Sequence, residues 1–158
     1  MAEKGELRVV ATNRKARHDY EILDTLEAGI ALLGPEVKSL RAGRANLAEG
    51  YAVIRRGEAF LRGVHISPYA QAGRENPEPR RESKLLLHRR ELARLAGRLG
   101  ERGLTLIPLR IYFRGGRAKV ELALARGRRK ADRREAIRER EVQREIDRRL
   151  RRSARGGR

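Results

Sequence analysis

The feature that most limits how this chain can fold is an apolar segment at residues 20–33, which a glycine interrupts and a Gly-Pro pair ends. Four of its apolar residues occupy the alternating positions typical of a strand: Tyr20, Ile22, Ile30 and Leu32. A glycine inside a strand, here Gly29, favours a bulge or a close approach of two backbones. Gly34-Pro35 ends the strand and begins a helix, because the fixed φ of proline suits the first helical turn.

The short helix that follows is expected to have two different faces. Val37 and Leu40, three residues apart, give it an apolar face, and Gly43 stands where a left-handed C-cap is favoured. The other face carries three cations: Lys38, Arg41 and Arg44. We therefore expect strand and helix to present one cationic surface, with three polar residues at its edges: Asn13, Glu27 and Asn46.

Turns and periodicity predict the remaining elements. Further strands are expected at residues 51–55, 59–66, 104–113 and 117–125. A helix from Leu87 to Gly103 is favoured by His88 as N-cap and Glu91 three residues later. Pro108 indicates an edge or a bulge. Three prolines and a glycine predict a long loop at residues 67–81, and residues 1–12 are expected to be a flexible basic lead-in. Periodicity alone thus favours an antiparallel β-barrel with helices.

The charge of the chain indicates a polyanionic partner. Its net charge is +18 and its pI is about 11.5, and clustered Lys and Arg attract phosphate groups. Membrane surfaces are also anionic, but no apolar run approaches the ~20 residues that a membrane span needs. The chain has no cysteine, and its start does not resemble a signal peptide. We therefore expect a cytoplasmic monomer that does not bind membranes.

The last part of the chain differs in composition. Residues 126–158 hold 15 basic and 6 acidic side chains, which gives +9 of the total +18. The large apolar residues there form one thin helical stripe: Ile137, Val142, Ile146 and Leu150. Ion pairs are expected at i,i+4 between Glu145 and Arg149 and between Asp147 and Arg151, but each contributes only about 0.2 to 0.5 kcal/mol, which cannot offset the ordering cost. This tail is therefore expected to be disordered or partly helical alone, and to fold on binding.

Signals of catalysis are missing from the sequence. It has no phosphate-binding GxxxxGK[ST] loop and no GxSxG motif. The three histidines, at 18, 65 and 88, lack the spacing of metal ligands, so no metal and no cofactor are expected. Glu27 and Glu36 could face one another, but nothing in the sequence indicates the burial that tunes a catalytic pKa. The chain is therefore interpreted as a binding protein.

Several long motifs, in order over residues 13–141, resemble one known family. They are NRKARHDYEI, LEAGIALLGPEVKSLRAGRANL, GEAFLRGVHISPY, KLLLHRREL, AKVELALARGRRK and DRREAIRERE. Together they resemble the SsrA-binding protein (small protein B) family, the partner of transfer-messenger RNA. The resemblance implies a mainly β fold with helices (α+β): an OB-fold-like antiparallel barrel of about six strands with about three helices. The barrel would span residues 13–125 and the tail residues 126–158.

The resemblance and the pattern of polar residues together give a candidate RNA-binding surface. It comprises Asn13, Arg14, Lys15, Arg17, His18, Glu27, Lys38, Arg41, Arg44, Asn46, Leu86 and Lys119. By its sequence alone, Leu86 favours a core position. The resemblance instead places a leucine of this run against RNA, with Lys119 nearby. A carboxylate such as Glu27, if it faces RNA, should accept hydrogen bonds from base amino groups or a 2′-hydroxyl.

The resemblance also implies a function. The barrel would bind the tRNA-like domain of transfer-messenger RNA, and the complex would enter stalled ribosomes for trans-translation. The tail would lie in the decoding region and the mRNA path through Gly127, Arg128, Arg129, Lys130, Asp132, Arg133 and Arg134. Two positions depart from the pattern of several relatives: Ala131 where a ring precedes the D-[KR]-R triplet, and Val142 in place of tryptophan. The alternatives are a ribosomal or general structured-RNA-binding OB protein and, less favoured, a nucleic-acid enzyme.

Overall fold

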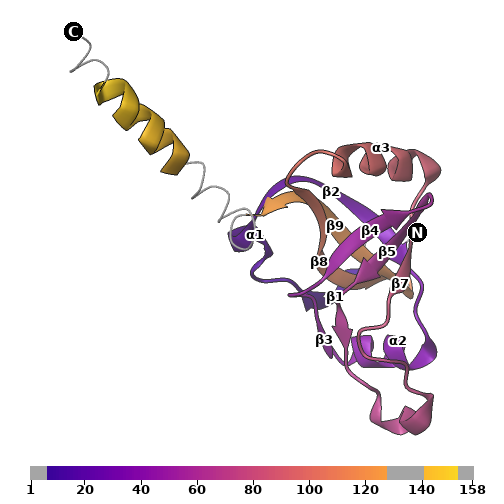
Figure 1. Ribbon diagram of the computed structural model, residues 1–158. Coiled ribbons are helices and arrows are strands. Elements are labelled where there is room, and N and C mark those ends of the chain that lie inside the picture. The colour runs from indigo at the N-terminus through magenta and orange to yellow at the C-terminus, as the bar shows by residue number, and fades with distance from the viewer. Residues whose placement is uncertain (1–6, 128–140, 153–158) are drawn as a thin grey trace.

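Most of the strands form one antiparallel sheet that curls into a barrel, as Figure 1 shows. The computed structural model describes residues 7–127 and 141–152. The strands of this sheet are β1 (Leu7–Thr12), β2 (Tyr20–Ile30), β4 (Tyr51–Arg55), β5 (Glu58–Arg62), β7 (Ser83–Leu86), β8 (Leu104–Arg114) and β9 (Arg117–Gly127). A small second sheet pairs β3 (Ala45–Asn46) with β6 (His65–Ile66).

The sheet closes because β8 pairs with strands from both ends of the order. The order is β1-β8-β4-β5-β7-β2-β9, and β8 also pairs with β9. A ring of β8, β4, β5, β7, β2 and β9 results, with β1 added outside β8. The closure between β4 and β8 is short, through the pair Ala52 and Leu106. The prediction of an antiparallel barrel of about six strands is therefore confirmed.

Several helices lie around the barrel, and a further helix lies in the tail. They are α1 (Ala16–Asp19), α2 (Gly34–Arg41), α3 (Arg89–Leu99), the 3-10 helix η2 (Ala70–Glu75) and a helix over residues 141–152. In Figure 1, α3 lies across the top of the barrel and α2 lies below it. No helix in the described ranges is long and apolar enough to cross a membrane.

The helix starts follow their capping residues. The Leu33 N–H donates to the Glu36 carboxylate at 2.8 Å, and the His88 N–H donates to Glu91 at 3.1 Å. In both helices an acidic side chain in the first turn thus satisfies a backbone donor outside the helix. Gly43, with φ of +73°, has the left-handed conformation expected after α2. The predicted starts of both helices are confirmed.

The barrel interior takes one face of each strand. Along β9, three alternating residues are buried inside it: Val120, Leu122 and Leu124. On the other face of β9, Ala123 and Ala125 belong to a second, smaller cluster that includes Ala16 of α1. The register of β8 shifts between Pro108 and Arg110, so this strand changes faces and contributes to both clusters. The bulge predicted at Pro108 is confirmed.

Two boundaries differ from the sequence predictions because of pairing and backbone crowding. Residues 7–12, expected within a flexible lead-in, form β1, which pairs antiparallel with β8; residues 1–6 lie outside the described part. The strand expected at 59–66 is broken at Gly63, which has φ of +75°. A Cβ at Gly63 would lie 2.3 Å from the carbonyl oxygen of Glu49, so only glycine fits there.

Four further differences concern residues 83–127. Ser83–Leu86 forms β7, which periodicity did not predict because only a short run of three leucines marks it. The following helix ends at Leu99 with Gly100 as C-cap, before the expected Gly103. Gly97 has open space where close packing was expected. Finally, β9 extends through Gly127, two residues beyond the predicted end of the barrel.

Candidate nucleic-acid interface

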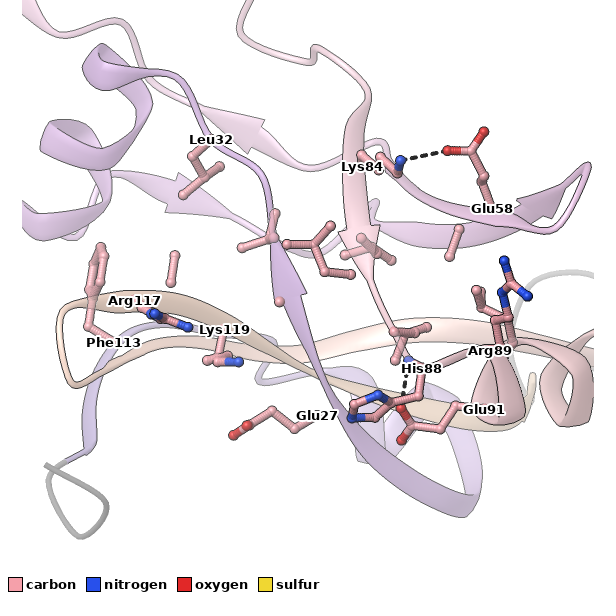
Figure 2. Close-up of a pocket in the computed structure, with 18 of the residues that line it drawn as sticks. Glu27, Leu32, Glu58, Lys84, His88, Arg89, Glu91, Phe113, Arg117 and Lys119 are labelled. Atoms are coloured by element: carbon pink, nitrogen blue, oxygen red, sulfur yellow. Dashed lines mark hydrogen bonds and ion pairs between the residues drawn. The ribbon is translucent and has the colours of Figure 1, made fainter. Parts of the chain in front are cut away.

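An open groove of ≈ 990 Å³ brings together three residues that lie far apart in the sequence (Figure 2). Its lining includes Glu27 of β2, Leu86 of β7 and Lys119 of β9. In the strand register, Gly29 lies directly opposite both Leu86 and Lys119. Glu27 is two residues before Gly29, so its side chain lies on the same face of the sheet. The structure thus places these three predicted residues on one surface.

Gly29 gives this surface its hollow shape. A Cβ at this position would lie 3.1 Å from the Leu86 Cβ and 3.3 Å from its Cδ1, closer than ordinary van der Waals contact. The sequence predicted a bulge or a close approach of two backbones at Gly29, whereas the close neighbour is the side chain of Leu86 and the bulge of β2 lies between Ile22 and Asp24. Because Gly29 has no side chain, the space between Leu86 and Lys119 stays open.

Leu86 is exposed, whereas its neighbour Leu85 is in the core. The relative exposure of Leu86 is 55%, against 2% for Leu85. β7 alternates regularly, with Ser83 and Leu85 inside and Lys84 and Leu86 outside. The core position favoured by its sequence alone is therefore wrong for Leu86. An exposed leucine in a groove rimmed by cations can contact a ribose or a base face.

Two side chains of β8 hold the carboxylate of Glu27 in place. Its Oε2 atom accepts a hydrogen bond from the Tyr112 hydroxyl at 2.5 Å and forms an ion pair with Arg114 Nη2 at 3.1 Å. Tyr112 is only 3% exposed, and burial together with the hydrogen bond to Glu27 raises its pKa to about 12. Because the phenol stays protonated at neutral pH, it remains a donor to Glu27.

Cations that the sequence analysis did not select also line the groove. Arg89 at the start of α3 and Arg117 after the β8–β9 turn are exposed and contribute to its lining. In the described ranges, neither these two residues nor Lys119 has a carboxylate within 4.0 Å. Lys84, by contrast, donates to Glu58 at 2.7 Å, and this hydrogen bond lowers the pKa of Glu58. The sequence feature that could have identified Arg117 is its position directly after the two glycines of the β8–β9 turn.

Helix α2 adjoins the groove. Val37 of α2 and Phe113 of β8 line it, and the Arg41 guanidinium lies over the Phe113 ring at 5.2 Å. Lys38 lies over the Tyr69 ring at 5.5 Å. The predicted cations Lys38, Arg41 and Arg44 are all exposed. They extend the positive charge from the groove along α2 and to Arg44, three residues beyond its end.

A buried ion pair anchors α2 to the chain before β7. Glu36 is 3% exposed, and its two carboxylate oxygens accept from Arg81 Nη2 at 2.7 Å and Nε at 3.2 Å. Arg81 also donates to the Ala31 carbonyl at 3.4 Å. The hydrogen bond to Glu36 raises the pKa of Arg81. Glu36 therefore pairs with Arg81 and does not form the acidic pair with Glu27 that the sequence analysis considered.

The predicted residues near the start of the chain lie away from the groove. Tyr20 follows α1 and pairs with Gly127, whereas Glu27 is seven residues further along β2, about 23 Å at the usual strand rise. The exposed side chains at this end are Arg14, Lys15, Arg17 and His18. They lie beside the point where the tail leaves the barrel (Figure 1). The expected single surface edged by Asn13 and Glu27 is therefore divided in two.

Two predicted asparagines make local contacts. The Asn13 amide donates to the carbonyls of Pro108 at 3.1 Å and Leu47 at 3.4 Å, which joins α1 to β8 and to the segment after β3. Asn46 accepts from the Ala48 N–H at 2.9 Å. The amide of Asn13 thus has a structural role in the free protein, and an RNA contact by either residue stays a prediction.

Most predicted tail residues fall outside the described ranges. Gly127 is the last residue of β9. The other predicted residues lie outside the described ranges: Arg128, Arg129, Lys130, Asp132, Arg133 and Arg134, together with Ala131. Residues 141–152 form a helix whose apolar stripe is exposed, with 58% for Val142, 44% for Ile146 and 63% for Leu150. The predicted Glu145–Arg149 pair is present at 3.1 Å.

The groove contains no feature of a metal centre. Within the residues that the structure describes, no three His, Asp or Glu side chains come together in a way that could hold a metal ion. Among the described residues, the groove carboxylates are Glu27, Glu58 and Glu91, and each already accepts a hydrogen bond from another group of the chain. The arrangement suits recognition by hydrogen bonds, apolar contact and phosphate pairing.

Comparisons with known proteins agree on one family. The family model described as "SmpB protein" matches residues 10–152. The SsrA-binding protein of Acidothermus cellulolyticus is 58% identical over 158 residues, covering 100% of this chain and 99% of its own. That of Roseiflexus castenholzii is 58% identical and covers 94% of each chain. A solved chain described as "tmRNA-SmpB: a journey to the center of the bacterial ribosome" matches with a TM-score of 0.66 and 53% identity, over 80% of this chain and 93% of that one.

Proposed function

Because this chain belongs to the SmpB family, we propose that it is an SsrA-binding protein: it binds the tRNA-like domain of transfer-messenger RNA and delivers that RNA to stalled ribosomes. The observation that carries the proposal is the groove that joins Glu27, Leu86 and Lys119. It offers an acceptor, an exposed apolar side chain and a cation within one hollow. In folded RNA, hydrogen-bond donors, ribose faces and phosphates lie similarly close to one another.

The groove favours a folded RNA over a flexible single strand. Proteins that bind single strands without sequence preference stack bases on exposed aromatic rings. Among the described residues that line this groove, the only phenylalanine, tyrosine or tryptophan is Phe113, which is 8% exposed and covered by Arg41. The imidazole of His88 is the one exposed ring of the lining, too little for a stacking platform. The nearby Tyr112 is also buried. Binding would therefore depend on shape, hydrogen bonds and phosphate contacts.

The tail supplies the second half of the proposed function. It would enter the decoding region and the mRNA path of a ribosome that lacks a codon there. In its described helix, at residues 141–152, the arginines are exposed and so is the apolar stripe. This is expected of a segment whose side chains become buried only when it binds a partner. The protein would position the RNA, and the ribosome would catalyse peptide transfer. This function would be carried out in the cytoplasm.

Replacing Glu27 by alanine tests the groove. A non-specific RNA binder should gain affinity slightly from this change, because its net charge rises from +18 to +19. A specific groove should instead lose a hydrogen bond to a charged acceptor, about 1.5 to 3 kcal/mol or about 10- to 150-fold in Kd. Filter binding or fluorescence anisotropy with the isolated tRNA-like domain measures the difference.

Glu21→Ala is the matched control. Glu21 lies on the same strand, its side chain is 47% exposed, and it pairs with Arg126. Its replacement therefore removes the same negative charge from the same strand, but outside the groove. We expect its affinity for the RNA to equal or exceed that of the unmodified chain. If both variants bind as the unmodified chain does, the groove is not the interface, and a ribosomal or general RNA-binding role becomes the better account.

A further inference from the structure

The two oxygens of the Glu27 carboxylate have different surroundings. Both contacts from the protein, the Tyr112 hydroxyl at 2.5 Å and Arg114 Nη2 at 3.1 Å, go to Oε2. Within the described residues, Oε1 accepts no hydrogen bond from the chain. Glu27 lines the groove, and Figure 2 shows its side chain at the edge of the hollow, close to Lys119. One oxygen is thus anchored and the other remains available to a ligand.

The anchor itself is fixed. The ring of Tyr112 lies between two guanidinium groups, with Arg110 at 5.1 Å and Arg114 at 5.8 Å from its centroid. Arg110 is held in turn by Glu121, through Nε to Oε1 at 3.0 Å. The tyrosine therefore cannot rotate away without breaking these stacked contacts. Its raised pKa keeps the hydroxyl protonated, so that it donates to Glu27 throughout the neutral range.

We propose that Tyr112 is a positioning residue: it anchors Glu27 through Oε2, so that Oε1 is presented as an acceptor to a hydrogen-bond donor of the RNA. This inference rests on the proposed function of the groove and adds the chemistry of the RNA group that Glu27 meets. The ligand group is a donor, either a base amino group or a ribose 2′-hydroxyl, and not a phosphate oxygen, which would be repelled by the carboxylate.

Glu27→Gln distinguishes a donor from an acceptor on the RNA. Tyr112 and Arg114 both donate, so they will hold the oxygen of the new amide and turn its NH2 group towards the groove. A donor on the RNA then meets a donor on the protein, and affinity should fall at least as far as in Glu27→Ala, tenfold or more. If Glu27→Gln binds as tightly as the unmodified chain, or more tightly, the proposed acceptor role is wrong.

Tyr112→Phe tests the positioning role with the smallest possible change. It keeps the ring between the two arginines and removes only the hydroxyl, so we expect an unchanged melting temperature within about 2 °C and a loss of affinity of about tenfold. In a Glu27→Ala background the same change should have no further effect on affinity. Tyr51→Phe, at an exposed ring outside the groove, is the control and should bind normally.

The outcomes separate this inference from the proposed function. If Glu27→Ala itself has no effect, the groove assignment fails. If Glu27→Ala weakens binding but Tyr112→Phe does not, only the positioning role fails. If Tyr112→Phe weakens binding equally with and without Glu27, it acts through the structure of the barrel, and the inference is again wrong.

Modified RNA identifies the donor. In one set of tRNA-like domains a single base loses its exocyclic amino group, by inosine for guanosine, purine riboside for adenosine or 2-pyrimidinone riboside for cytidine. In a second set single 2′-hydroxyls are removed. One substitution should weaken binding to the unmodified chain and have no effect on binding to Glu27→Ala. If this substitution removes an amino group, the donor is that amino group. If it removes a 2′-hydroxyl, the donor is that hydroxyl. If no substitution in either set loses its effect in Glu27→Ala, Oε1 does not accept from the RNA and the inference is overturned.

Discussion

A chain that ends at Gly127 is expected to fold and to bind the tRNA-like domain, yet to support no peptide tagging on stalled ribosomes. The cut follows the last residue of β9, which pairs with Tyr20, so every strand of the barrel stays complete. The segment removed holds 14 basic and 6 acidic side chains, a net +8 of the total +18. RNA binding should therefore remain with a shallower salt dependence, because fewer phosphates are neutralised.

Tagging assays on ribosomes stalled at the end of a message measure this directly, alongside RNA affinity at several salt concentrations. Replacing Asp132, Arg133 and Arg134 together by alanine is the finer variant, because it changes the net charge by only one unit. If tagging survives both changes, the tail is only a counterion for RNA. If the shortened chain no longer captures the RNA, the barrel is not the specific reader.

The largest expected effect on stability comes from Arg81→Met. Glu36 would be left as a buried carboxylate without its cation, since both of its oxygens accept from this one guanidinium. Removing one partner of a buried ion pair costs about 3 to 5 kcal/mol in the free energy of unfolding. Urea unfolding of the full chain should show a lower midpoint with an unchanged slope.

Two controls separate the buried pair from arginine loss in general. Arg98→Met removes an exposed pair with Glu101, where both side chains are about half exposed, and should change stability by less than about 1 kcal/mol. Glu36→Gln added to Arg81→Met should recover part of the loss. It removes the unpaired charge while its amide oxygen still accepts from the Leu33 N–H. A loss below about 1 kcal/mol in Arg81→Met would show that Glu36 finds water or another donor.

Local patterns predicted the elements whose causes are local. The Gly34-Pro35 pair marked the start of α2, Glu91 marked the start of α3, and Pro108 marked a bulge, because each acts on residues within one turn of itself. The short strand β7 was missed because three leucines in a row show neither a helical nor a strand period. β1 was missed because its order depends on β8, about 100 residues away in the chain.

The candidate site could be predicted only in part. Glu27, Leu86 and Lys119 meet because Gly29 pairs with strands on both sides, a register that no local pattern carries; their selection came from family resemblance. Asn13 looked equally polar, but its amide is directed to Pro108, which is 95 residues away. Arg89 and Arg117 were missed because the chain has many arginines, and only tertiary structure shows which of them line the groove without a carboxylate partner among the described residues.

The central claim is that the barrel reads a folded tRNA-like RNA. The most direct test compares, at matched salt, the affinity of the full chain for the isolated tRNA-like domain of transfer-messenger RNA and for poly-U of the same length. We expect the tRNA-like domain to bind at least about 100-fold more tightly, a gap at the lower end of that between specific and non-specific nucleic-acid complexes. Equal affinities for the two RNAs would contradict the claim and leave a cationic barrel without a specific partner.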